Sequence, residues 1–271
     1  MTPPSLPEFP TLLLRLDGGV LHVTLNRPER KNALSPQMMD DLLEVFTWVP
    51  AVVKPRAVVL RGAGGTFCAG ADIKEMSKQR AADPSNPKRS IALGNRRFGD
   101  VLSAAAAVPA PLLAIAEGAV LGGGFGLVCV SDIAFALPSA RFGLPETGLG
   151  VIPAQIAPFV VKRVGMVQAR RLMLTGARFD STEALRLGMI HETCADEAAL
   201  EASLNRTLTD IRRCAPGANA ATKQLLRRVE TSELETALDI AAQVFAAAQL
   251  GPEAREGTKA FLEKRAPEWA K

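Results

Sequence analysis

The segment that most constrains this chain is AEGAVLGGGFGLVCVSD, residues 116–132. It concentrates five glycines in nine residues: Gly118, Gly122, Gly123, Gly124 and Gly126. Apolar runs precede and follow it. Because glycine lets a backbone approach another backbone or a ligand closely, the pattern predicts a strand, a glycine-rich turn and a helix. The start of such a helix presents free backbone N–H groups and the positive end of its dipole.

A second segment has the same design. RAVVLRGAGGTFCAGADIKEM, residues 56–76, also reads as a strand, a glycine-rich turn and a helix. If N–H groups from both turns pointed at one position, they would form an oxyanion hole. A dinucleotide fingerprint fits poorly, because G-x-G-x-x-G starting at Gly124 needs glycine at position 129, which is Cys129. Glycine used only for tight packing remains the alternative at this stage.

Elsewhere the pattern predicts an α/β protein. Two alternating runs around Asp17, Gly18 and Gly19 indicate a β-hairpin. Strand-like and helix-like stretches then alternate, and the final stretch is helical. We therefore predict an α/β core over residues 1–196 and a C-terminal helical region over residues 197–271.

Composition disfavours several classes of protein. The chain has 271 residues and only two histidines, so we expect no metal site. Its four cysteines lack C-x-x-C spacing, which favours reduced thiols in the cytoplasm, and the start lacks the features of a signal peptide. Pro109 and Pro111 interrupt the longest charge-free run, so we expect no membrane span. The net charge is only +4, and with 5% aromatic residues the chain has few side chains on which bases could stack, so we do not expect nucleic-acid binding.

Five motifs occur in a fixed order along the chain. They are LNRPERKNALS, GTFCAGADIKEM, EGAVLGGGFGL, ARFGLPETGLGVIP and EGTKAFLEKRAPEW. Together they resemble the enoyl-CoA hydratase/isomerase family, the crotonases, over nearly the whole chain. The resemblance implies a crotonase-like spiral of repeated ββα units, with C-terminal helices that build homotrimers or hexamers. It also implies an acyl-CoA thioester as substrate, and no cofactor beyond the coenzyme A that the substrate carries.

The resemblance also assigns the catalytic groups. The family's two oxyanion donors match the backbone N–H groups of Ala71 and Gly123, and its acid/base glutamate matches Glu146. The chemistry requires such groups, because the α-proton of a thioester moves readily only when the enolate oxygen is stabilised. A carboxylate must then carry protons to and from the carbon atoms.

The family's substrate contacts fall on two kinds of position. Contacts to coenzyme A match Arg30, Lys31, Ala33, Ala69, Asp72, Ile73, Lys74, Gly122, Phe261 and Lys264. The acyl-pocket positions are Asn95 and Gly126. For the charged residues a solvated surface remains the alternative, and Asn95 is either a packed amide or a pocket group. We expect Arg96 and Arg97 to face solvent rather than a substrate carboxylate, and Cys68 to be a packing residue rather than a nucleophile.

Gly126 departs from the two-glutamate hydratases of the family. It stands where those enzymes carry their other glutamate, and the sequence predicts free space about the size of a carboxylate side chain. One carboxylate suffices for a Δ3,Δ2-enoyl-CoA isomerase. The surrounding motifs resemble hydratases of branched, carboxylated enoyl-CoAs of the methylglutaconyl and isohexenylglutaconyl type, so we favour a hydratase. An isomerase, or a non-catalytic relative that binds acyl-CoA or RNA, remains the alternative.

Overall fold

The computed structural model describes residues 6–75 and 85–270. Its first element is the predicted hairpin, in which β1 (Leu12–Asp17) and β2 (Val20–Leu25) pair antiparallel through the turn at Gly18 and Gly19. Both glycines have positive φ, the backbone conformation that a tight hairpin turn requires. The hairpin prediction is confirmed.

The larger sheet continues from this hairpin in parallel. Its order is β1-β2-β3-β4-β6-β9. The added strands are β3 (Ala57–Gly62), β4 (Leu112–Ala116), β6 (Ile133–Ala136) and β9 (Glu192–Thr193). Every residue of β4 is buried, as expected for a central strand of a parallel sheet that is covered on both faces.

A smaller sheet begins within the glycine-rich segment at residues 116–132. It contains β5 (Ala119–Leu121), β7 (Arg141–Gly143) and β8 (Arg178–Asp180), in that order. Two isolated parallel bridges extend it, one between Cys68 and Val120 and one between Leu34 and Ala71. The sheet therefore brings both glycine-rich turns and the end of β7 to one region.

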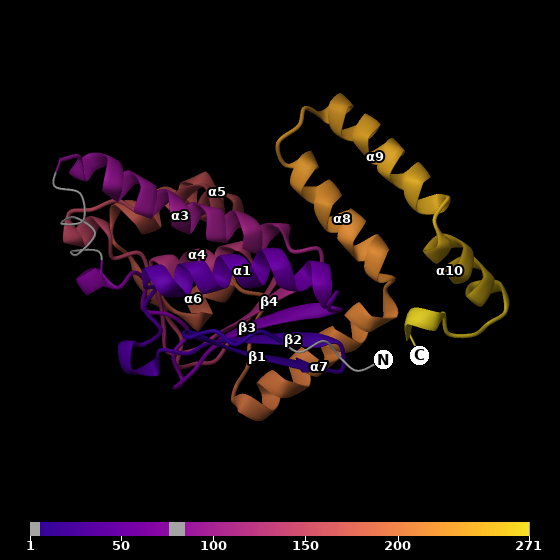
Figure 1. Ribbon diagram of the computed structural model, residues 1–271, viewed down its shortest axis with the longest axis horizontal. Coiled ribbons are helices and arrows are strands. Elements are labelled where there is room, and N and C mark those ends of the chain that lie inside the picture. The colour runs from indigo at the N-terminus through magenta and orange to yellow at the C-terminus, as the bar shows by residue number, and fades with distance from the viewer. Residues whose placement is uncertain (1–5, 76–84, 271) are drawn as a thin grey trace.

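Helices cover both faces of the larger sheet (Figure 1). The helical elements that precede α7 are η1 (Pro28–Arg30), α1 (Pro36–Val52), α3 (Pro87–Ala107), α4 (Gly123–Val130), η2 (Thr147–Leu149), α5 (Ala157–Leu174) and α6 (Ser181–Arg186). On the second face, α7 (Glu197–Arg213) buries Leu200, Leu208 and Ile211 against the strands. A helix also begins at residues 73–75, and the rest of that predicted helix lies outside the described residues.

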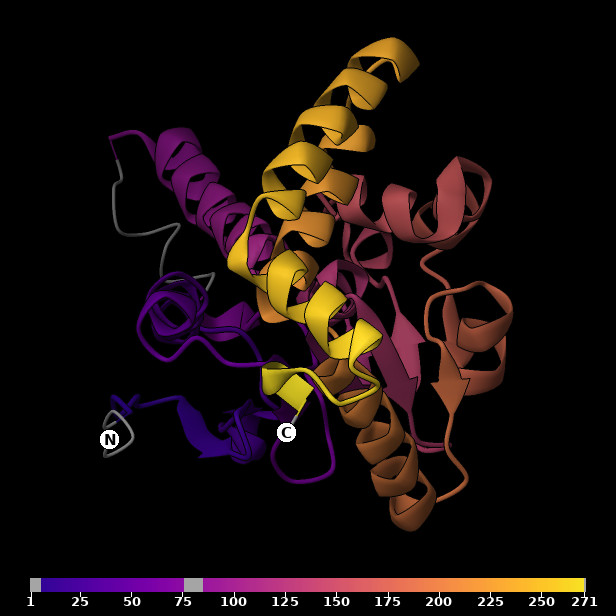
Figure 2. The same cartoon turned by 90° about the vertical axis from the view of Figure 1, so that its right-hand side faces the viewer.

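The last helices stand away from the sheets. They are α8 (Pro216–Val229), α9 (Leu234–Gln249) and α10 (Pro252–Leu262), followed by η3 (Glu268–Ala270). Figures 1 and 2 show α8 and α9 projecting as a pair, with α10 continuing beyond the end of α9. The mainly helical structure of residues 197–270 agrees with the prediction, while α7 packs against the larger sheet. None of the helices formed by the described residues combines the length and the apolar character needed to cross a bilayer.

Candidate active site

The two glycine-rich turns lie against each other. Cys68 N–H donates to Ala119 O at 2.8 Å, and Leu121 N–H donates to Cys68 O at 2.9 Å. These bonds place Gly70 beside Gly122, and a methyl group on Gly70 would lie only 3.0 Å from Leu121 O. Both glycines have positive φ. Glycine is required here by close approach and by conformation together.

Each turn presents one free N–H group next to this contact. Gly123 is the first residue of α4, so its N–H has no acceptor within the helix. Ala71 follows Gly70, and its N–H points away from the bridge to Leu34. Across residues 6–75 and 85–270, neither N–H donates to another protein group. The structure thus brings the two predicted donors into neighbouring turns with their hydrogen bonds unused.

Glu146 lies beside the same contact because of strand pairing. β5 and β7 run parallel, with Leu121 opposite Gly143, so the residues that follow both strands emerge at one edge. Gly122 N–H donates to Gly143 O at 3.0 Å, which fixes that edge. A methyl group on Gly122 would lie 2.8 Å from Glu146 Oε1. The carboxylate therefore faces the turn that carries one candidate donor.

The electrostatic state of Glu146 suits proton transfer. Its Oε2 atom is buried and has no hydrogen-bond partner among the described residues. Burial raises the pKa of Glu146 above its ordinary value, because removal from water disfavours the charged form. A carboxylate with an unused, poorly solvated oxygen is ready to accept a proton from a bound molecule.

This raised pKa leads to a pH prediction. If Glu146 acts as the base, kcat must fall as pH falls through its pKa, since the protonated form cannot accept a proton. The raised pKa places this fall above the pH at which an exposed glutamate, with a pKa of about 4.3, would titrate. Steady-state kcat measured across the acid range, with circular dichroism to confirm folding at each pH, checks this. A kcat that stays constant down to the pKa of an exposed carboxyl would contradict it.

The space expected beside Gly126 is filled. A methyl group on Gly126 would lie 2.5 Å from Cγ2 of Ile156 and 3.5 Å from Cδ2 of Leu102. Ile156 is itself 3% exposed. The prediction of free space was wrong, because Gly126 serves the close packing of α4 against the start of α5. If Gly126 shapes the acyl pocket, it does so only by letting Ile156 pack closely against α4.

Gly123 has similarly crowded surroundings. A methyl group there would lie 2.4 Å from Cδ1 of Leu34 and 3.1 Å from Cζ of Phe98. A larger residue at position 123 would thus press on the protein's own side chains before it met a ligand. Leu34 and Phe98 border the candidate donor, and sequence reasoning did not assign Leu34 to the site.

The predicted coenzyme A positions fall into two groups. Lys31 and Ala33 lie in the turn at residues 27–34, and Ala69 N–H donates to Lys31 O at 2.9 Å. The structure therefore brings that turn, with Arg30, next to the segment 69–74. Ile73 in this segment is 65% exposed, and Arg30, Lys31 and Lys74 are exposed. These side chains are therefore at the surface, on the segment that carries Ala71 and on the turn beside it. The Asp72 carboxylate instead turns inward to Arg27 at 3.1 Å.

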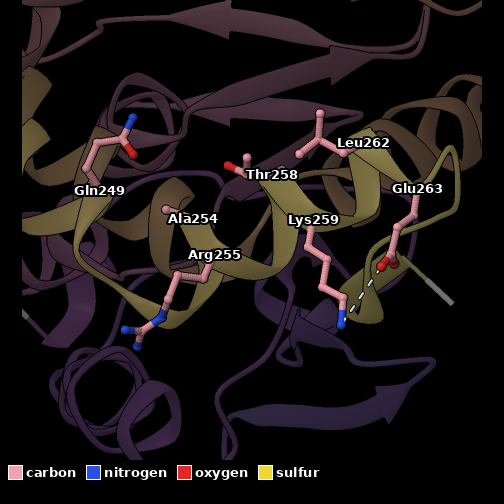
Figure 3. Close-up of a pocket in the computed structure, with 7 residues that line it drawn as sticks. All are labelled: Gln249, Ala254, Arg255, Thr258, Lys259, Leu262 and Glu263. Carbon is pink, nitrogen blue, oxygen red and sulfur yellow. Dashed lines mark ion pairs between the residues drawn. The ribbon is translucent and has the colours of Figure 1, made fainter.

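Phe261 and Lys264 belong to a different part of the chain. Phe261 is 83% exposed on α10, which stands away from the sheets, so it touches little of its own chain. A surface cavity of about 470 Å³ lies on this projecting part, between the end of α9 and α10 (Figure 3). Arg255 and Lys259 extend along one side of it, and Lys259 pairs with Glu263. Glu146 and the glycine-rich turns contribute no residue to this cavity.

The remaining candidates have protein partners. Asn95 Oδ1 accepts a hydrogen bond from Gln155 Nε2 at 2.9 Å. Arg96 pairs with Asp100, and Arg97 pairs with Asp40.

Cys68 behaves as predicted from its sequence context. Its thiol is buried, and burial raises its pKa to about 12. A thiol with that pKa stays protonated at neutral pH and is a poor nucleophile.

The two-sheet fold, with its helical covering and projecting C-terminal helices, is that of the crotonase class. Residues 15–271 match the family described as enoyl-CoA hydratase/isomerase, and the chain belongs to this family.

Three relatives illustrate the match. The structure of Pseudomonas aeruginosa AtuE is 56% identical, with a TM-score of 0.91, and the match covers 96% of this chain and 100% of that one. Enoyl-CoA hydratase EchA19 of Mycobacterium tuberculosis is 33% identical over 95% of this chain and 96% of its own length. The 1,2-epoxyphenylacetyl-CoA isomerase of Escherichia coli is 32% identical over 95% of this chain and 97% of its own length. Similarity therefore extends to a named hydratase and a named isomerase.

Proposed function

We propose that this protein is an enoyl-CoA hydratase that adds water across the α,β double bond of an enoyl-CoA thioester. The observation that carries the proposal is the orphaned, buried oxygen of Glu146 beside the contact of the two glycine-rich turns. A purely structural glutamate would have its buried oxygen paired. This unpaired oxygen also favours catalysis over a role in acyl-CoA or RNA binding alone.

The proposed mechanism uses the chain's own groups. The thioester oxygen accepts hydrogen bonds from the N–H groups of Ala71 and Gly123. Glu146 takes a proton from a water molecule while the water oxygen bonds to the β carbon, and the thioester becomes an enolate. The protonated Glu146 then gives its proton to the α carbon. Water is thereby consumed in full, and neither a cofactor nor a metal ion takes part.

Isomerisation is the second candidate, and a specific observation supports it. Ile156 fills the space beside Gly126, so the site lacks room there for another carboxylate. One carboxylate suffices to move a proton between two carbons of an enolate. We favour hydration because of the resemblance to hydratases that act on branched, carboxylated thioesters, and we propose substrates of that class.

One experiment separates these functions. A panel of linear, branched and carboxylated enoyl-CoA thioesters is incubated with the protein in water labelled with heavy oxygen. A hydratase incorporates the label into the product, whereas an isomerase changes only the double-bond position. We expect labelled product, with the fastest turnover on a branched or carboxylated thioester. Unlabelled, rearranged product would establish the isomerase instead.

We further propose that the protein forms a trimer or hexamer. The projecting helices expose large apolar side chains, which a solvated surface rarely presents together. They include Leu234 at 71%, Phe245 at 66%, Leu250 at 80% and Phe261 at 83% exposure. Covering these side chains with a neighbouring subunit would also bring Phe261 and Lys264 toward that subunit's substrate.

We expect light scattering at micromolar protein concentration to give three or six times the mass of one chain. Phe245→Glu should shift the mass toward the monomer, because a charge cannot be buried at an apolar contact without large cost. Glu235→Gln, an exposed change on the same helix, serves as the control. A monomeric wild type would overturn the assembly proposal and the roles of Phe261 and Lys264 with it.

The four cysteines are free in the structure. This supports our proposal that the protein works in the reducing environment of the cytoplasm.

A further inference from the structure

One peptide plane controls where the Ala71 N–H points. The plane joins Gly70 to Ala71, and its carbonyl oxygen and its N–H point in opposite directions. Leu34 N–H donates to Gly70 O at 2.8 Å, so the Ala71 N–H is turned away from Leu34. Gly70 has a φ of +92° and no side chain to resist rotation. The direction of the Ala71 donor therefore depends on how firmly Leu34 is held.

Arg27 holds both strands of the isolated bridge between Leu34 and Ala71. Its Nη1 atom donates to Ala33 O at 2.5 Å, directly before Leu34. Its Nη2 atom donates to Asp72 Oδ2 at 3.1 Å, directly after Ala71. The side chain of Arg27 is 18% exposed and that of Asp72 is 9% exposed, so water competes weakly for these bonds. A single guanidinium thus holds Ala33 and Asp72, the sequence neighbours of the two bridged residues Leu34 and Ala71.

Asn32 holds the turn from which Arg27 reaches. It is fully buried, and its Oδ1 atom accepts from Arg27 N–H at 2.8 Å. Its Nδ2 atom donates to Ala63 O at 2.9 Å and to Thr66 O at 2.6 Å. These bonds tie the turn at residues 27–34 to the glycine loop that leads into Ala71.

The same turn contains backbone strain. Lys31 and Asn32 have φ values of 49° and 54°, in the left-handed region that non-glycine residues rarely adopt. Strained conformations persist only where their surroundings over-determine them. The three side-chain bonds of Asn32 supply that constraint. Its amide is therefore held in one orientation by contacts on both sides.

We propose that Arg27 and Asn32 are positioning residues that fix the Ala71 N–H as an oxyanion donor. This inference rests on the proposed function and deepens it, because neither side chain is assigned to substrate, proton transfer or the hole itself. Catalytic geometry is sensitive to displacements of less than about 1 Å. A donor on a peptide plane next to glycine needs such external support.

The test uses Asn32→Gly and Arg27→Met. Asn32→Gly keeps a backbone that accepts positive φ but removes all three side-chain hydrogen bonds. We expect kcat to fall about 10- to 100-fold, with a much smaller change in KM. This loss of kcat is smaller than the 10²–10³-fold loss that follows outright removal of an oxyanion donor. Arg27→Met should act in the same direction. Arg27→Lys, which retains a charged donor, should recover part of the lost kcat.

The matched control is Thr11→Val. It also removes a buried hydrogen bond, from Thr11 Oγ1 to Asp41 at 2.6 Å, and it lies outside the glycine-rich turns. We expect this variant to lose thermal stability as the Asn32 variant does, yet to keep its kcat once folded. Equal kcat in Asn32→Gly and Thr11→Val would overturn the positioning role.

A spectroscopic measurement reports on the donor directly. Butyryl-CoA labelled at its carbonyl carbon cannot be hydrated, and its C=O stretching frequency falls when the oxygen accepts hydrogen bonds. We expect a lowered frequency on the wild type and a smaller lowering on Asn32→Gly and Arg27→Met. An identical frequency on all of them would overturn the inference.

The two readouts separate this inference from the proposed function. If the wild type turns over no enoyl-CoA but the carbonyl shift still depends on Asn32, the positioning role stands and the catalytic proposal is wrong. If the wild type is active and the shift and kcat do not depend on Asn32, the catalytic proposal stands and the positioning role is wrong.

Discussion

Glu146→Gln is expected to lower kcat on the best enoyl-CoA substrate by about 10²–10⁴-fold, the range that a positioned acid/base group contributes. Glutamine keeps the shape of the side chain but cannot take a proton from water or return one to carbon. KM should change little, since the proposed oxyanion donors and the proposed coenzyme A contacts remain. Steady-state kinetics on purified protein measures both constants.

The same variant should fold at least as well as the wild type. Burial raises the pKa of Glu146, so the folded state disfavours the carboxylate relative to the unfolded chain. Above the raised pKa this lowers the free energy of unfolding, and neutral glutamine removes that penalty. Thermal unfolding at neutral pH should therefore show an unchanged or higher Tm.

Glu183→Gln is the matched control. Glu183 is a glutamate outside the site that pairs with Arg171 and Arg186, and those ion pairs lower its pKa to about 2. We expect the control to keep kcat. Full turnover by Glu146→Gln would show that the proton is carried by another group. An inactive variant with a lowered Tm would instead indicate that Glu146 supports the fold.

Local sequence patterns predicted the fold where nearby residues determine the structure. The turn at Asp17, Gly18 and Gly19 pairs two alternating strands, and that hairpin formed as expected. The glycine-rich turns were recognisable because Gly70 and Gly122 need positive φ as well as close approach. The order of strands in the sheets and the projection of α8–α10 required tertiary information, because the same helical pattern fits a packed or a projecting helix.

Long-range contacts explain what the sequence could not show. A missing side chain at Gly126 signals that something lies close, but not what it is. The neighbour is Ile156, which is far along the chain. The role of Asn32 was similarly hidden, since its two donated bonds end on carbonyl groups more than 30 residues away. The motif LNRPERKNALS contained this residue, yet its pattern gave no partner.

Gly126→Glu is expected to unfold or aggregate the protein rather than supply another catalytic carboxylate. Its Cβ atom would begin 2.5 Å from Cγ2 of Ile156, inside van der Waals contact. The rest of the side chain would bring a charge into an apolar core without a partner. We expect a loss of about 4 kcal/mol or more in the free energy of unfolding, at the severe end for single substitutions. Urea denaturation at one fixed protein concentration measures it.

A double-mutant cycle tests whether Ile156 is the cause. Gly126→Ala alone should cost about 1–3 kcal/mol through overpacking, and Ile156→Ala alone about 2–5 kcal/mol through the cavity it leaves. Together they should cost less than the sum, because the new methyl group enters the space that Ile156 vacates. Additive costs would mean that the two residues do not compete for space.

The same competition for space should affect activity. Only when Ile156 is reduced to alanine does Gly126→Glu have room for its carboxylate beside α4. We therefore expect the paired variant Gly126→Glu with Ile156→Ala to be better folded than Gly126→Glu, and to gain hydration of crotonyl-CoA relative to Ile156→Ala. A well-folded Gly126→Glu with raised crotonyl-CoA activity would show that the space beside Gly126 opens without help. In that case Ile156 would be a movable wall of the acyl site rather than a fixed part of the core.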